Sequence, residues 1–164
     1  MRLSHSVDMA IPANAVDLYR WLTEMTPAEY ETYSRAHRAM GSWFEDDEFH
    51  MVNVEMIGNE MIKQHYILKE HRPDRISLYS QATKAYVLRW FPATVGVPWI
   101  VEVKAIDDQR SRLTCTIGAD FPNLGVRLGA WFNGFGGYFL HRHLIEESKH
   151  FARDIERKFS SPRS

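Results

Sequence analysis

The sequence predicts an α+β fold in which seven antiparallel strands pack against a long C-terminal helix. Strand-like alternation of apolar and polar residues opens the chain, recurs in short segments between residues 49 and 121, and gives way to helical periodicity after residue 123. The 164 residues are enough for one sizeable core, so we expect residues 1–164 to form a single domain.

The N-terminal segment Leu3–Ile11 alternates with a period of two and predicts a half-buried strand that ends at Pro12. Asn14, followed by Asp17 three residues later, has the residue type and spacing of a helix N-cap. Apolar residues then recur at helical spacing, so we expect a short first helix here.

A second helix start is encoded at residues 26–29. Thr26 supplies a hydroxyl N-cap, Pro27 suits the first helical position, and Glu29 closes a capping box. We expect this helix to run to about Met40, where Gly41 and the acidic tract 45–48 interrupt it as a solvated loop.

The middle of the chain predicts a continuous antiparallel meander. Turn-forming stretches such as Gly58-Asn59 and Arg72-Pro73-Asp74 separate the alternating segments. The expected strands cover residues 49–57, 61–70, 74–82, 84–91, 98–106 and 112–120.

The C-terminal region 123–159 is helical in periodicity, but several glycines complicate its first half. Each interior glycine costs about 1 kcal/mol relative to alanine, so we expect a break near residues 134–137. The firm helix should cover about 138–158, with an apolar stripe that includes Leu144, Phe151 and Ile155.

His143 and Glu147 are the most informative residues of this helix. They lie four residues apart, so one helix face carries both side chains. An imidazole and a carboxylate in this arrangement can hold a divalent metal or transfer a proton, and the same pair also occurs as an ordinary surface contact. Glu147 lies close to the apolar stripe on the helical wheel, which favours a pair that leans inward.

Composition and charge exclude several classes of function. The net charge of −1 provides no overall basic field for nucleic acid or an anionic membrane. No apolar run approaches the ~18 residues of a membrane span, and residues 1–11 lack the apolar core of a signal peptide. Cys115 is the only cysteine, which excludes an intramolecular disulfide and a cysteine-rich zinc site, and we expect a cytoplasmic protein.

Aromatic residues are unusually frequent, with five Trp, seven Tyr and nine Phe. This surplus indicates either an aromatic-lined cavity or a core filled with rings. Together with the apolar faces of the last strands and of the C-terminal helix, it predicts an internal ligand-binding cavity. The expected lining residues are Tyr66, Trp99, Val101, Cys115, Phe139 and Leu140.

The order of elements resembles the START-like superfamily, also called the helix-grip or SRPBCC fold, which includes the birch pollen allergen and the aromatase/cyclases. The opening segment is similar to that family's first strand and helix, with an alternating strand, the tripeptide Ile11-Pro12-Ala13 and the aromatic-leucine pair Trp21-Leu22. The resemblance implies a curved sheet that grips the last helix, with a deep apolar cavity between them. Members include lipid carriers, hormone receptors, polyketide cyclases and hydrolases, so the fold alone names no reaction.

The step His143-Leu-Ile-Glu-Glu147 also resembles the last helix of a metal-dependent branch, the diacetylphloroglucinol hydrolases, which cleave a carbon–carbon bond in acylated phenols. That branch takes two ligands from such a step, and a further His and Glu from the sheet region. The resemblance therefore implies a metal site, with zinc as the candidate ion, at His143 and Glu147, completed from the strands. The candidates there are His50, Glu55, His65 and Glu70, of which His50 is preferred because it shares a face with Val52, Val54 and Met56.

Three functions therefore stay open. The chain can bind a small hydrophobic, aromatic or polyketide-like molecule in its interior, as a carrier or interaction module. It can also be a hydrolase or cyclase that uses His143 and Glu147, either with a bound zinc ion or as metal-free acid–base groups.

Overall fold

The computed structural model describes residues 1–58, 60–87, 91–121 and 137–160. The strands are β1 (Arg2–Met9), β2 (His37–Glu45), β3 (Glu48–Ile57), β4 (Glu60–Arg72), β5 (Arg75–Val87), β6 (Phe91–Ala105) and β7 (Ser111–Gly118). The helices are η1 (Ala13–Ala15), α1 (Leu18–Thr23), α2 (Pro27–Tyr33) and α4 (Tyr138–Phe159). The strands form one seven-stranded sheet in the order β1-β7-β6-β5-β4-β3-β2.

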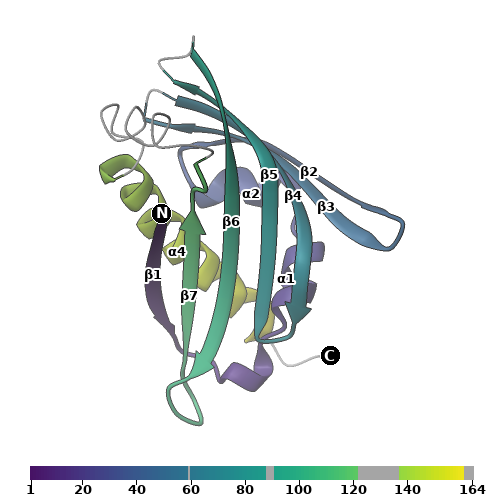
Figure 1. Ribbon diagram of the computed structural model, residues 1–164. Coiled ribbons are helices and arrows are strands. Elements are labelled where there is room, and N and C mark those ends of the chain that lie inside the picture. Colours follow the sequence, from purple (N-terminus) through teal and green to yellow (C-terminus); the bar gives the residue numbers. More distant parts are fainter. Residues whose placement is uncertain (59, 88–90, 122–136, 161–164) are drawn as a thin grey trace.

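The predicted α+β class and the antiparallel sheet are confirmed. Every pair of neighbouring strands is antiparallel. The sheet is curved, and α4 lies behind it across β1 and β7, while the hairpin β2–β3 reaches away at the opposite edge (Figure 1). The helices in the described ranges include none that is long and apolar enough to span a membrane.

The two short helices begin at side-chain caps. The predicted capping box of α2 is confirmed, because Thr26 Oγ1 accepts a hydrogen bond from the Glu29 amide at 3.2 Å and the Glu29 carboxylate accepts one from the Thr26 amide at 2.9 Å. The prediction for the first helix is wrong by three residues. Asp17, and not Asn14, caps α1 by accepting from the Arg20 amide at 3.0 Å.

The expected extension of the second helix to Met40 is wrong. Helix α2 ends at Tyr33, Ser34 is extended, and His37–Glu45 form the edge strand β2. Asp46 and Asp47 then reverse the chain into β3 with φ angles of 48° and 65°. Tight hairpin turns require positive φ at both central residues, and aspartate tolerates this region. The acidic tract is therefore a hairpin turn.

The predicted total of seven strands is correct, but it contains two errors that cancel. The segment predicted at 74–82 and the part of the segment 84–91 up to Val87 belong to the single strand β5, whose pairing with β6 shifts in register between Ser80 and Thr83. The strand absent from the prediction is β2. Strand β6 also begins at Phe91, well before the predicted start at residue 98.

The C-terminal helix is confirmed, since α4 spans Tyr138–Phe159. Of the predicted break at 134–137, only Gly137 is among the described residues, where it forms the N-cap of α4. Leu144, Phe151 and Ile155 are fully buried and form part of the core, as their helical spacing predicts.

Asp154 fastens the short helices to α4. Its carboxylate accepts hydrogen bonds from Trp21 Nε1 of α1 at 2.9 Å and from Tyr33 Oη of α2 at 2.7 Å. Burial raises the pKa of Asp154, but hydrogen bonds from Arg157, Tyr33 and Trp21 outweigh it and hold that pKa below its usual value. One buried carboxylate thus fixes three helices relative to one another.

The inner face of the sheet is set by the odd-numbered residues of β3. Phe49, Met51, Asn53, Glu55 and Ile57 are all buried. Since side chains alternate along a strand, these residues point toward α4, and the two polar ones among them, Asn53 and Glu55, are placed in the interior.

Candidate metal centre

Four buried side chains converge between the sheet and α4. His37 begins β2, Glu55 lies opposite it on β3, and His143 and Glu147 lie one turn apart on α4. One possible ligand atom from each residue lies within 4.8 Å of the others. None of the four residues is more than 5% exposed. We refer to these four residues as the inner cluster.

The closest approaches have the spacing of ligands around one ion. His37 Nε2 lies 3.3 Å from Glu147 Oε1 and 3.8 Å from Glu55 Oε1. His143 Nε2 lies 3.6 Å from Glu55 Oε2 and 3.9 Å from Glu147 Oε2. Ligands about 2.0–2.2 Å from a tetrahedral zinc ion lie about 3.3–3.6 Å from one another. The four imidazole–carboxylate contacts are thus close to this spacing, while one ligand atom from each of the four residues lies within 4.8 Å of the others.

The imidazole of His37 is held in one orientation and one tautomer. Its Nδ1 lies 2.6 Å from the carbonyl oxygen of Tyr30. A carbonyl can only accept, so Nδ1 carries hydrogen and the neutral ring has its lone pair at Nε2. The Tyr30 ring stacks on the imidazole, with centroids 3.9 Å apart and planes 3° from parallel. His37 Nε2 faces the two carboxylates and makes no aligned hydrogen bond to any residue that the structure describes.

Ser34 fixes the tautomer of His143. Ser34 Oγ accepts from the Ala36 amide at 3.1 Å and donates to Glu146 Oε2 at 3.3 Å. Its remaining lone pair therefore receives a hydrogen from His143 Nδ1, which is 3.0 Å away. The neutral ring again has its lone pair at Nε2, which is buried and which no described residue hydrogen-bonds.

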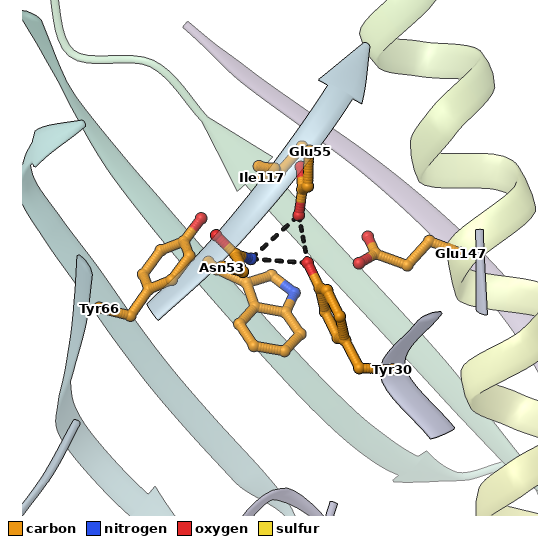
Figure 2. Close-up of a pocket in the computed structure, with 7 residues that line it drawn as sticks. Tyr30, Asn53, Glu55, Tyr66, Ile117 and Glu147 are labelled. Atoms are coloured by element: carbon orange, nitrogen blue, oxygen red, sulfur yellow. Dashed lines mark hydrogen bonds between the residues drawn. The ribbon is translucent and has the colours of Figure 1, made fainter. Parts of the chain in front are cut away.

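Glu55 is positioned through one of its oxygens. Tyr30 Oη donates to Oε1 at 2.5 Å and Asn53 Nδ2 donates to the same atom at 3.0 Å, as the dashed lines in Figure 2 show. Glu55 Oε2 is buried, faces His143 and has no hydrogen-bond partner within the described part of the chain. Metal sites commonly use such outer partners to orient a ligand, while a second atom of the same group binds the ion.

The electrostatics of the inner cluster favour positive charge. Burial lowers the pKa of His37, but Glu147 and Glu55 outweigh this effect and raise it above its ordinary value. Burial raises the pKa of Glu147, but nearby His37 and His143 outweigh this effect and lower it. A cation between these groups, either a proton or a metal ion, would satisfy both carboxylates.

A small cavity adjoins the inner cluster. The centre of a water-sized sphere can occupy about 10 Å³ of this cavity, so the cavity has room for about one water molecule. Glu147 approaches it from one side and Tyr66 from the other (Figure 2). The ligand-sized cavity expected from the sequence stays a prediction. The lining residues of the small cavity are Tyr30, Asn53, Glu55, Tyr66, Trp99, Ile117 and Glu147.

The residues predicted to bind a ligand fall into three groups. Trp99 and Tyr66 line the small cavity. Val101, Cys115 and Leu140 are buried in the core between sheet and helix, where burial raises the pKa of the Cys115 thiol to about 12 and makes it unreactive. Phe139 is 47% exposed, and its ring lies over Gly58 at the β3–β4 turn.

His50, the preferred third metal ligand, is not brought to His143 and Glu147. It lies on the other face of β3, where its Nδ1 is 3.0 Å from His65 Nε2 and the ring of Trp43 stacks beside both imidazoles. We call Trp43, His50 and His65 the outer cluster. Glu55, one of the alternatives from the sequence, is the strand residue that meets the pair.

His37 is the member of the inner cluster that sequence reasoning missed, because residues 26–40 read as one helix. A signal for the hairpin was present. Trp43-Phe44 and Phe49 flank the acidic turn at Asp46-Asp47, and aromatic residues on both sides of a short polar turn are typical of paired strands.

Comparisons with known proteins find likeness in structure alone. No family model matches the sequence, and no curated protein matches it. The Zhui aromatase/cyclase from Streptomyces sp. R1128 superposes with a TM-score of 0.68 at 12% identity, over 96% of this chain and 94% of that one. Major latex-like protein 151 from Panax ginseng gives 0.60 at 8% identity, over 94% and 97% of the two chains.

A third similar structure is a START superfamily protein from Mycobacterium smegmatis, with a TM-score of 0.57 at 10% identity over 96% of this chain and 98% of that one. Such low identities carry no information on activity, but the matches extend over nearly the whole of each chain. The chain therefore has the START-like, helix-grip fold, with a curved seven-stranded antiparallel sheet and a long C-terminal helix.

Proposed function

We propose that this chain is a metal-dependent enzyme that hydrolyses a small, largely apolar molecule held between the sheet and α4. The observation that supports this most strongly is the inner cluster, in which two imidazoles and two carboxylates are buried around one point. Three of its atoms (His37 Nε2, His143 Nε2 and Glu55 Oε2) have no hydrogen-bond partner among the described residues. Burying such groups is costly unless something compensates them.

The charge of the inner cluster fits a divalent cation. In the neutral tautomers selected by the contacts at Nδ1, the imidazoles contribute no charge, and Glu55 and Glu147 contribute two negative charges. A zinc ion would balance these charges, and at a catalytic site it would also keep one position for water or substrate beside its protein ligands. Imidazole nitrogen and carboxylate oxygen are both ordinary zinc ligands.

When bound, such an ion supplies Lewis-acid polarisation of a substrate oxygen and activates water as a nucleophile at neutral pH. The chain contributes positioning. Ser34 orients His143, and Tyr30 and Asn53 orient Glu55. Trp99 and Ile117 add apolar walls to the adjoining cavity, and a wall that excludes bulk water strengthens the electrostatic interactions inside.

We infer an aromatic or polyketide-like substrate from two likenesses. The step from His143 to Glu147 resembles that of the diacetylphloroglucinol hydrolases, which add a His and a Glu from the sheet region. His37 of β2 and Glu55 of β3 are of these residue types. The fold is also that of an aromatase/cyclase. The proposed reaction is therefore hydrolytic removal of an acyl group from a ring.

A metal-free acid–base cyclase, or a carrier of a hydrophobic molecule, is the second candidate. The raised pKa of His37 favours it, because Glu147 and Glu55 outweigh burial and stabilise a proton on this imidazole. In that state, the protonated imidazole of His37 takes the place of the metal and pairs with Glu147 and Glu55.

Metal content separates the two candidates. After loading with zinc and dialysis against metal-free buffer, we expect one ion per chain by elemental analysis. His143→Ala and Glu55→Ala should lose the ion, with folding checked by circular dichroism. His50→Ala is the matched control, since it removes an imidazole from the other face of β3, and it should retain the ion. Failure of the folded wild-type chain to retain Zn²⁺, Mn²⁺, Fe²⁺ or Ni²⁺ would leave the metal-free candidate.

A further inference from the structure

A groove with a volume of about 400 Å³ lies between α4 and the short connection from α2 to β2. Sites for small molecules are commonly hollows of about 300–1,000 Å³. The connection is fastened to α4, because His150 Nδ1 donates a hydrogen bond to the carbonyl oxygen of Tyr33 at 2.7 Å. The residues that line the groove are Arg35 of the connection and Arg142, Ile145, Glu146, Lys149, His150 and Arg153 of α4. We call it the basic groove.

Positive charge is concentrated in the basic groove. Four of its lining residues are cationic and one is anionic, which leaves an excess of three positive charges, whereas the whole chain has a net charge of −1. The cations are Arg35, Arg142, Lys149 and Arg153, and all four are exposed. The groove is therefore a local basic site on a chain that has no overall basic field.

The single carboxylate of the groove is turned away from these cations. Glu146 lies four residues after Arg142 and three before Lys149, a spacing that commonly forms ion pairs on a helix. Instead, Glu146 Oε2 accepts from Ser34 Oγ at 3.3 Å, and Oε1 accepts from the amide of Arg35 at 3.4 Å. Glu146 thus holds the connection against α4 and leaves the cations to another partner.

The cations of the groove form no ion pair with any described carboxylate. Along α4, the pairs of Lys and Arg with carboxylates join Arg157 and Lys158 to Asp154 and Glu29, beyond the groove. Within the groove, Lys149 and Arg153 lie four residues apart, and like charges at this spacing destabilise a helix. An anion bound between them would remove this repulsion.

We propose that the basic groove binds a small molecule that carries two or more phosphate groups. Guanidinium groups match phosphate oxygens with two parallel hydrogen bonds, and three of the four cations are arginines. A diphosphate has about three negative charges at neutral pH, which equals the excess charge of the groove. Residues 142–153 extend over roughly 16 Å along the helix axis, so an extended anion contacts more of the cations than a single phosphate does.

The basic groove is separate from the inner cluster but adjoins it. Ser34 Oγ contacts Glu146 of the groove and His143 Nδ1 of the inner cluster, so Ser34 lies between the two sites. All the groups that would bind the phosphates are side chains of the groove. The groove should therefore bind its anion whether or not the inner cluster holds a metal ion.

Isothermal titration calorimetry with inorganic pyrophosphate tests the proposal. We expect one pyrophosphate per chain with a dissociation constant below about 100 μM in 0.1 M NaCl, and binding at least about tenfold weaker for orthophosphate. Raising NaCl to about 0.5 M should weaken binding, because exposed charges are screened. Tighter binding of ADP than of pyrophosphate would identify a nucleotide as the source of the phosphates, and equal binding would identify free polyphosphate.

Substitutions locate the bound anion. Lys149→Gln and Arg153→Gln should each weaken pyrophosphate binding by about three- to tenfold, since each removes a charge-assisted hydrogen bond. Lys69→Gln is the matched control, because it removes one exposed lysine from β4 and should leave binding unchanged. Glu55→Ala removes a carboxylate of the inner cluster and should also leave binding unchanged. Circular dichroism checks that each variant is folded.

Four outcomes would overturn the anion site. Wild type that does not bind pyrophosphate refutes it directly. Equal weakening by Lys69→Gln and Lys149→Gln would mean that only the overall charge matters. Loss of binding in Glu55→Ala would place the pyrophosphate on a metal ion in the inner cluster. Binding to vesicles of phosphatidylserine and phosphatidylcholine, without binding to pyrophosphate, would assign the groove to a membrane surface. Pyrophosphate binding by a chain that retains no metal would support the groove and refute the proposed function.

Discussion

The inner and outer clusters hold similar residues on opposite faces of the sheet, and β2 and β3 contribute to both. Each contains two histidines with a carboxylate nearby. Beside the outer cluster this carboxylate is that of Glu48, whose Oε2 lies 4.0 Å from His50 Nε2. In the outer cluster the imidazoles bond to each other at 3.0 Å, and the ring of Trp43 beside them is 40% exposed. In the inner cluster, Ser34 and Tyr30 occupy the Nδ1 atoms, so both Nε2 atoms are directed at the carboxylates.

The difference shows that residue type does not define a metal site. A histidine becomes a ligand when one nitrogen is bonded to a fixed partner and the other faces a buried, negatively charged space. The inner cluster meets this condition twice and the outer cluster does not. The predictions below test the contrast, starting with the largest expected effect.

Removing bound metal should lower the melting temperature of the chain, and this decrease should depend on the inner cluster alone. Metal at 100–1,000 times its dissociation constant stabilises the folded state by about 2.7–4.1 kcal/mol. Adding a chelator to the zinc-loaded chain should therefore lower the melting temperature by roughly 5–15 °C. The double variant His50→Ala/His65→Ala should show the same decrease. An equal melting temperature with and without chelator in the wild type would contradict the metal centre.

Ser34→Ala tests the outer partner of His143. The substitution leaves the Nδ1–H of His143 and the amide of Ala36 without their acceptor, which should lower the free energy of unfolding by about 1–3 kcal/mol. It should also weaken zinc binding by about 10–100-fold. Denaturant unfolding and competition with a chromophoric chelator measure the two effects. Ser42→Ala, on the exposed part of β2, is the control, and equal effects of both variants would refute the role of Ser34.

Substituting Glu60 tests how burial changes the pKa of a carboxylate that lacks the hydrogen bonds made to Glu55. Glu60 is 5% exposed, its Oε2 has no hydrogen-bond partner in the described ranges, and burial raises its pKa to about 7. Since the folded-state pKa lies above that of the unfolded chain, Glu60 contributes its stabilisation at low pH and loses it as pH rises through about 7. Glu60→Gln should therefore be more stable than wild type at pH 8 by about 1 kcal/mol, and this gain should disappear at pH 5. A gain independent of pH would exclude a raised pKa.

The outer cluster should contribute least to the free energy of unfolding and to zinc binding. His65 is exposed, so His65→Ala should change the free energy of unfolding by about 0.5 kcal/mol or less and should leave zinc binding unchanged. Chemical denaturation and elemental analysis provide both measurements. A loss of zinc in this variant would show that the outer cluster also binds metal.

Much of the fold could be predicted from local patterns. Alternation defined β1 and most of the meander, and helical spacing defined α4 to within one residue. The capping box at Thr26 and Glu29 located the start of α2, since caps depend on neighbouring residues alone. The end of α2 was not predictable in this way. Its extended continuation is stabilised by pairing with β3, which the local sequence does not reveal.

The candidate site was only half predictable for a related reason. The spacing of His143 and Glu147 places them on one helix face, and both are buried as inferred. The strand ligands depend on which face of β3 points inward. Val52, Val54 and Met56 made the even-numbered face look internal, yet they are only partly buried. Both faces are apolar enough to be inside, so periodicity could not separate His50 from Glu55.

The origin of the four inner-cluster residues has a consequence for how the protein is made. His37 and Glu55 belong to a hairpin near the N-terminus, and His143 and Glu147 to the last helix. The ribosome delivers the hairpin first, and contacts between distant segments form late because they must close long loops. The hairpin alone supplies two of the four groups, so an ion bound by all four would mark a finished fold and could not guide its early stages.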